Sequence, residues 1–143
     1  MAKVLIVQAP YYEDIIEEMA MGAVEVLDEA GHDYDRLNVT GAFEIPGAIA
    51  QVDASPQSEY DGYIALGCVL RGETDHYDHI CRESANGLQM LAIQQRLAIG
   101  YGILTVDSAE QAWDRANREE KNKGAEAALA CLKMMEIHDL FPS

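Results

Sequence analysis

The chain has 143 residues, of which 49% are hydrophobic, and its 25 acidic and 10 basic side chains give a formal net charge of -15. This length and composition favour one globular domain over residues 1–143, and the charge argues against nucleic acid and anionic membranes as partners. No apolar run is long enough to cross a membrane, and the three cysteines are too few and too scattered for a disulfide framework, so we expect a cytoplasmic protein.

Short apolar runs alternate with helical patterns along the first half of the chain. The pattern predicts a buried strand over residues 3–8, a helix over residues 13–30 that ends at a glycine, and a strand over residues 34–39. A second helix should begin around Pro46, because proline suits a first helical turn, and a loop should follow over residues 53–59.

The second half of the chain contains its most informative segment. A short apolar strand is expected over residues 61–66, and residues 67–79 are typical of a strand-to-helix turn. The elements expected after this turn are a long helix to about residue 96, a strand over residues 99–105, a helix opened by a capping box at residues 108–111, a break at residues 122–124, and a final helix with its apolar stripe at residues 127–135.

Strands that alternate with helices indicate a parallel sheet. We therefore predict an α/β fold, a three-layer α/β/α sandwich around a four-stranded parallel sheet. The turns that start at Pro10, Gly41, Cys68 and Leu104 should then meet at the carboxyl edge of the sheet, where ligands bind in such folds.

The turn at residues 67–79 has the residue types of an anion site. Gly67 and Gly72 allow unusual backbone angles and close approach of a ligand. The N–H groups of Glu73 and Thr74, just before a helix, suit a phosphate, and His76 and His79 can transfer protons near neutral pH. We expect an anion-binding turn beside an acid/base group.

Aromatic and acidic residues occupy the other turns. Either Tyr11 or Tyr12 could stack on a flat heterocycle, although a ring packed on the sheet edge is an equal alternative. Glu44, beside Phe43, could accept hydrogen bonds from a polyol or could cap a helix. Tyr101 on its own is typical of an ordinary strand aromatic.

One basic cluster stands out in this acidic chain. Arg115, Arg118, Lys121 and Lys123 fall within one short stretch. This pattern fits either a small anionic ligand or a solvated helix end.

Metal binding and a cysteine nucleophile are weaker interpretations. His76 and His79 share a helix face, but Cys81 points elsewhere, so we expect no metal. No group is spaced to orient a base for Cys68.

Five segments, in order, carry a resemblance over nearly the whole chain. The sequence resembles the lumazine synthases (6,7-dimethyl-8-ribityllumazine synthases) of riboflavin biosynthesis in these segments: Gly41 to Pro46, Gly67 to Asp78, Gly102 to Asp107, Glu110 to Ala116, and Asn122 to Gly124. The resemblance implies a flavodoxin-like fold and the condensation of 5-amino-6-(D-ribitylamino)uracil with 3,4-dihydroxy-2-butanone 4-phosphate. That reaction releases phosphate and water and needs no metal or redox cofactor.

The resemblance also implies roles for individual residues. It makes His76 the proton donor and assigns the butanone phosphate to Glu73, Thr74 and Arg115. Cys68 and Tyr11 depart from the residues common at their positions, Thr or Ser and Phe or Trp, but should keep the same roles. The residues implied to bind the ribitylaminouracil are Tyr11, Ala42, Phe43, Glu44, Cys68, Val69, Leu70, Tyr101 and Lys123.

The resemblance further implies a homopentamer in which Tyr101, Arg115 and Lys123 reach a neighbour's site. The segment 116–121 lacks the glycines typical of capsid-forming relatives, and the chain begins almost at its first strand, so we expect a free ring, with a larger assembly of rings as the alternative. Other functions considered are a non-catalytic flavin or lumazine carrier, an electron carrier of the flavodoxin type, and a shell protein.

Overall fold

The structure is a computed structural model that describes residues 2–143. Its strands are β1 (Lys3–Gln8), β2 (Asp33–Asn38), β3 (Gly62–Leu70) and β4 (Ile99–Val106). Its helices are α1 (Glu13–Ala30), the 3-10 turn η1 (Ala42–Glu44), α2 (Ile45–Ala54), α3 (His76–Gln94), α4 (Ala109–Ala116) and α5 (Lys123–Leu140). No helix in residues 2–143 is both long and apolar enough to span a membrane.

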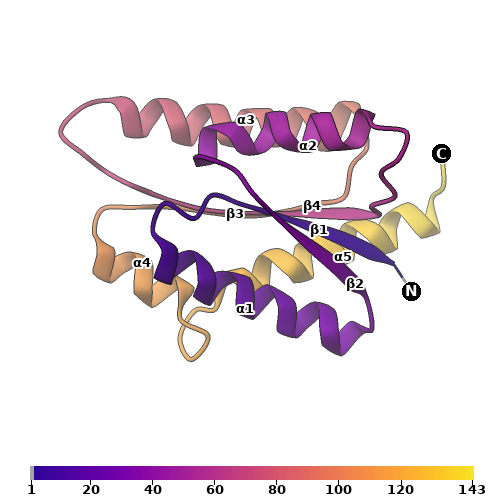
Figure 1. The fold of residues 1–143 in the computed structure, drawn as a ribbon, viewed down its shortest axis with the longest axis horizontal. Coiled ribbons are helices and arrows are strands. Elements are labelled where there is room, and N and C mark those ends of the chain that lie inside the picture. Colours follow the sequence, from indigo (N-terminus) through magenta and orange to yellow (C-terminus); the bar gives the residue numbers. More distant parts are fainter. Residues whose placement is uncertain (1) are drawn as a thin grey trace.

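The four strands form one parallel sheet in the order β2-β1-β3-β4. Helices α2 and α3 cover one face, and α1, α4 and α5 cover the other (Figure 1). The predicted three-layer α/β/α sandwich is therefore confirmed. All strands end at the same edge, at the end of the molecule opposite the two termini (Figure 1).

The burial of the central strands differs from that of the edge strand β2. The central strands β1 and β3 are continuous apolar runs because helices cover them on both faces. The edge strand β2 is mostly exposed and polar. Helix α1 turns a stripe that includes Ile16, Met19 and Leu27 to the core, and Gly31 ends it in the left-handed region, with φ 77°.

Two glycines expected to interrupt β4 instead allow a helix to approach it. The strand is continuous through Gly100 and Gly102. A β-carbon at Gly100 would collide with the carbonyl of Ala127, and one at Gly102 would lie 3.0 Å from the β-carbon of Ala127, both in α5. Their missing side chains let α5 lie directly on the sheet.

Several predicted boundaries were wrong. Strand β3 continues to Leu70, so the turn covers only residues 71–75, and Cys68 to Leu70 are strand residues. Gly31 is the one described glycine with a positive φ, so Gly67 and Gly72 do not have the unusual backbone angles expected of them. A β-carbon at Gly67 would lie 3.3 Å from that of Ala42, so this glycine admits η1 against the strand.

Three other boundaries also moved. The fourth strand ends at Val106, which shifts the last turn to Asp107. Helix α5 begins at Lys123, inside the expected break, and α2 runs on through Ala54. Such small shifts are of the size by which the ends of elements fray and their definitions differ.

Candidate active site

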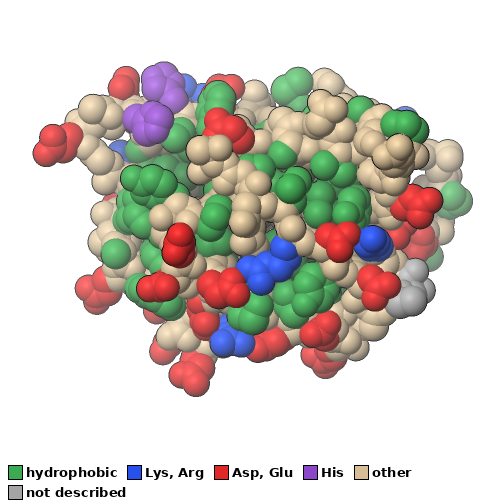
Figure 2. Space-filling view, viewed as in Figure 1, with side chains coloured by type: hydrophobic (Ala, Val, Ile, Leu, Met, Phe, Trp, Pro, Cys, Tyr) green, Lys and Arg blue, Asp and Glu red, His purple; other side chains and the backbone are tan. Residues whose placement is uncertain are grey.

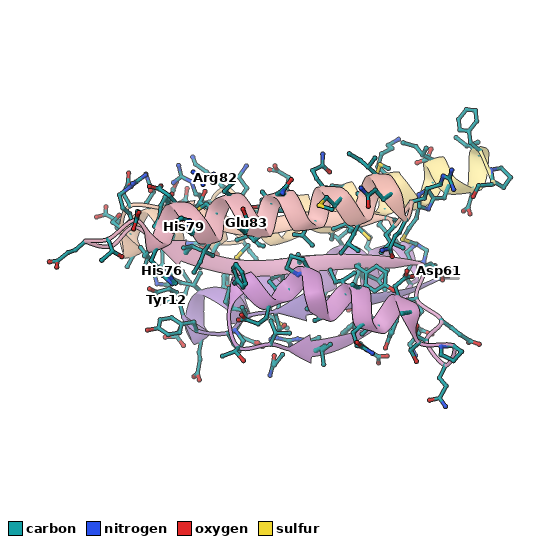
Figure 3. The ribbon with its side chains drawn as sticks, turned by 90° about the horizontal axis from the view of Figure 1, so that it is seen from above. Tyr12, Asp61, His76, His79, Arg82 and Glu83 are labelled. Atoms are coloured by element: carbon teal, nitrogen blue, oxygen red, sulfur yellow. The ribbon has the colours of Figure 1, made fainter. Side chains whose placement is uncertain are left out.

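A cavity of about 620 Å³ opens at the carboxyl edge of the sheet. Figure 2 shows histidine side chains beside hydrophobic surface at this end, and Figure 3 shows His76, His79 and Tyr12 there, far from Asp61. The lining residues are Ala9, Tyr11, Tyr12, Thr40, Gly41, Ala42, Phe43, Glu44, Cys68, Val69, Leu70, His76, His79 and Ile80.

Four segments far apart in sequence supply this lining. Strand β1 leads into Tyr11 and Tyr12, and η1 presents Phe43 and Glu44. The end of β3 and the first turn of α3 complete the wall. The expected meeting of turns at one sheet edge is correct for these segments, because parallel strands deliver their carboxyl ends to one place.

The cavity has aromatic rings that the chain itself leaves largely uncovered. Tyr11 is 76% exposed and Phe43 is 54% exposed. Tyr12, which is less exposed, meets Tyr11 edge to face, with ring centroids 4.9 Å apart. Exposed rings held beside a cavity provide faces on which a flat ligand can stack.

The last residues of β3 offer backbone groups to the cavity. Pairing of β1 with β3 ends at Gln8 and Leu66, where the Leu66 carbonyl accepts a hydrogen bond from Ala9. Backbone groups alternate sides along a strand, so those of Cys68 and Leu70 face the same side as those of Leu66, beyond the end of β1. Their N–H and C=O groups are available to the edge of a heterocycle.

The turn after β3 can hold an anion. No hydrogen bond joins the N–H groups of Gly72, Glu73 or Thr74 to another described residue, whereas the His76 N–H contacts the Thr74 hydroxyl at 3.3 Å. Helix α3 begins at His76, so its positive end points toward this turn. Glu73 and Thr74 adjoin the cavity rather than line it.

Burial decides the chemistry of Cys68. It raises the pKa of the thiol to about 11, so the group stays protonated near neutral pH and is a poor nucleophile.

Among residues 2–143, no group of three or more His, Cys, Asp or Glu side chains is arranged to hold a metal.

Three residues implied for the site lie away from this cavity. Tyr101 is half-exposed on β4 beside Ser84 of α3. Arg115 on α4 donates to the Gln111 carbonyl at 3.2 Å, and Lys123 at the start of α5 pairs with Glu126 at 3.1 Å. Within one chain these three do not line the cavity.

The cavity also includes residues that the resemblance does not assign to it. Tyr12 is an alternative to Tyr11 on residue type alone, and Thr40 carries no signal in the sequence. His79 is expected near the site as a second proton-transferring group, and it lines the cavity. Ile80 follows His76 by four residues and so shares its helix face, which was the available signal for it.

The chain is similar to known proteins over nearly its whole length. A family model described as 6,7-dimethyl-8-ribityllumazine synthase matches residues 1–139. The chain is 49% identical to the 6,7-dimethyl-8-ribityllumazine synthase of Bartonella tribocorum, over 96% of this chain and 91% of that protein. It is 50% identical to 6,7-dimethyl-8-ribityllumazine synthase 1 of Rhizobium meliloti, over 94% and 90%, and 46% identical to the Novosphingobium aromaticivorans enzyme, over 97% and 98%.

Proposed function

The chain belongs to the 6,7-dimethyl-8-ribityllumazine synthase family, and we propose that its reaction takes place in the cavity lined by Tyr11, Phe43 and His76. It is a transferase-type enzyme of riboflavin biosynthesis with small-molecule substrates. It condenses 5-amino-6-(D-ribitylamino)uracil with 3,4-dihydroxy-2-butanone 4-phosphate and releases phosphate and water. The observation that carries the assignment of the site is that exposed rings, open backbone groups and a helix N-terminus converge on one cavity.

The pyrimidine binds between rings and backbone. Tyr11 stacks on its face, the open backbone groups of Cys68 and Leu70 hydrogen-bond its edge, and Val69 lines the same wall. Glu44 and the backbone of Ala42 and Phe43 hold the ribityl hydroxyls, since a carboxylate is a strong acceptor for them. These contacts fix the amine that attacks the butanone.

The butanone phosphate binds at the turn before α3. Its phosphate accepts from the N–H groups of Glu73 and Thr74, which have no described partner within the chain. Its carbonyl carbon then lies near the pyrimidine amine, and holding the two substrates together supplies much of the rate.

His76 transfers the protons. Imine formation loses water, elimination of phosphate needs a proton removed from carbon, and ring closure loses a second water. An imidazole at the first residue of α3, exposed to the cavity and next to the phosphate turn, can serve each step near neutral pH.

A neighbouring subunit supplies the missing positive charge. Among the described lining residues there is no lysine or arginine, although a phosphate dianion favours one. We propose a homopentamer in which the neighbour's copies of Arg115, Lys123 and Tyr101 complete each site. A ring suits this arrangement because its head-to-tail contact places one chain's cavity against a different surface of the next.

The proposal extends to location and to one alternative. A cytoplasmic enzyme is supported by the three free cysteines, which fit a reducing compartment. A non-catalytic flavin or lumazine carrier on the same fold would have use for Tyr11 and Phe43 but not for His76 at the phosphate turn, and no observation favours it.

The test is to mix the two substrates with purified protein and to follow lumazine fluorescence and released phosphate together. We expect equimolar products at a rate well above the buffer reaction, and a loss of about 10²-fold in turnover in His76→Ala, with ribitylaminouracil binding retained. A protein that binds lumazine without accelerating its formation would be a carrier. A His76→Ala variant with wild-type turnover would remove His76 from the mechanism.

A further inference from the structure

We infer that Arg71 is a positioning residue for this reaction, one that holds the phosphate turn and His76 against the end of β4 through its ion pair with Asp107. The inference rests on the proposed function, because it concerns how that site keeps its geometry. Arg71 and Asp107 do not line the cavity, so their effect must pass through the residues that do.

Arg71 joins three parts of the sheet edge. It follows the last residue of β3, and its backbone N–H donates to the Val106 carbonyl at 2.9 Å. Its Nε donates to Oδ1 of Asp107 at 3.0 Å, just past β4. Its guanidinium group also lies 4.3 Å from the ring centroid of Tyr77 and 3.8 Å from the Asp78 carboxylate, both in the first turn of α3.

These contacts act on His76 because it immediately precedes Tyr77. The turn between Arg71 and His76 has few other contacts: the His76 N–H contacts the Thr74 hydroxyl at 3.3 Å, and the Asp75 carbonyl accepts from the His79 N–H at 3.2 Å. The guanidinium group touches both sides of this loosely held segment. It therefore fixes where the α3 N-terminus, and with it the imidazole, lies relative to the sheet.

Asp107 extends the same connection to α4. Its backbone N–H donates to the side-chain carbonyl of Gln111 at 2.7 Å, and the Gln111 backbone carbonyl accepts from Arg115 at 3.2 Å. The ion pair thus lies between the proton-transferring turn and the helix that carries the proposed phosphate ligand of the adjacent site.

The exposure of the pair separates a positioning role from a purely structural one. The side chains of Arg71 and Asp107 are 52% and 70% exposed. An exposed ion pair adds little to stability. A small misplacement of reacting groups can cost up to about 10²-fold in rate. Loss of the pair should therefore reduce turnover much more than it reduces thermal stability.

The experiment uses the full-length protein with Arg71→Met, Asp107→Asn and the double variant. We expect each single variant to lose about tenfold in kcat, with an unchanged Kd for ribitylaminouracil and a melting temperature near that of the wild type. The double variant should be no slower than the slower single variant, because both changes remove the same contact. In a His76→Ala background, Arg71→Met should cost less in kcat than it does in the wild type, because the imidazole is no longer there to be positioned and only the phosphate turn is affected.

Arg82→Met is the matched control. Arg82 lies farther along α3, does not line the cavity and makes no ion pair with another described residue, so the same change of charge should leave turnover near the wild-type value. Arg71→Lys should keep part of the rate, because an ammonium group can reach Asp107 but lacks the planar fork.

Several results would overturn the inference. Wild-type kcat in Arg71→Met would do so. Additive losses in the double variant would also overturn it, as would a loss from Arg71→Met that is as large in the His76→Ala background as in the wild type. If Arg71→Met alone weakened binding of inorganic phosphate while Asp107→Asn did not, Arg71 would be a direct phosphate ligand. If Arg71→Met does not fold, the same comparisons are made with Arg71→Lys. An inactive wild-type enzyme would instead contradict the proposed function.

Discussion

Tyr11 and Cys68 line the same cavity but differ in how far their side chains are exposed. Tyr11 is exposed and supported edge-on by Tyr12, while Cys68 is buried at a strand end. Residue type alone does not choose between Tyr11 and Tyr12 at the first turn, because both can reach the same space, whereas the family resemblance implies Tyr11. The structure shows both rings at the cavity and Tyr11 as the more exposed one.

Tyr11→Phe should be nearly silent, whereas Tyr11→Ala should weaken binding of ribitylaminouracil. The ring face rather than the hydroxyl contacts the pyrimidine, and an aromatic pair contributes about 0.5–1.5 kcal/mol beyond its buried area. Calorimetric titration of both variants with ribitylaminouracil measures this. A large loss of affinity in Tyr11→Phe would mean that the hydroxyl, rather than the ring face, makes the binding contact.

Cys68→Ser should turn over at a rate close to that of the wild type, because the residue serves through its backbone. Burial raises the pKa of the thiol to about 11, so the thiolate is scarce below pH 9 and alkylation of Cys68 by iodoacetamide should be slow there. The rate should increase as the pH rises toward 11. Mass spectrometry after timed labelling measures it, and rapid labelling of Cys68 at pH 7 would contradict this expectation.

At the scale of elements, the sequence pattern located the strands and helices apart from the short η1, and of the ends it misplaced, the largest error is at the end of β3. Gly67 resembled the start of a turn, because a glycine inside an apolar run is a common breaker signal. It is in fact a strand residue without a side chain because η1 packs against it. Gly67 and η1 are far apart in sequence, so their contact produces no local sequence pattern from which it could be predicted.

Gly100→Ala should destabilise the protein by about 1–3 kcal/mol or more, because the new methyl group would collide with the Ala127 carbonyl and push α5 from β4. Gly47 is the matched control: it is exposed in α2, and an added β-carbon would meet nothing within 4 Å. Gly47→Ala should stabilise by about 0.5–1 kcal/mol. Urea denaturation at one protein concentration compares the free energies of unfolding of the two variants and the wild type. Equal stabilities of Gly100→Ala and Gly47→Ala would contradict the close packing of α5 on β4.

At the scale of the whole molecule, one chain forms only part of the proposed site. The local motifs identified the cavity wall from Tyr11 to His76, and the structure brings those residues together. The family resemblance implies that Arg115 and Lys123 reach a neighbour's site, and the structure places both outside the cavity of their own chain. Residue spacing without that resemblance does not distinguish a residue's own site from a neighbour's.

We predict a free ring of five chains. With 15.7 kDa per chain, light scattering after size exclusion at moderate salt should report about five times that mass. The charge of -15 per chain should keep rings apart. A monomer would contradict the shared site, whereas a larger multiple of five would contradict only the inference that rings stay separate.

The most direct test of the account combines two damaged subunits. His76→Ala lacks the proton-transfer group and Arg115→Ala lacks the phosphate ligand, so each uniform assembly should be impaired. Rings co-assembled from equal amounts of the two chains should regain activity at about a quarter of their interfaces, where an intact His76 meets an intact Arg115 from the neighbour. The two assemblies mixed without subunit exchange should stay impaired. Co-assembled rings no more active than the average of their parents would contradict a site shared between subunits.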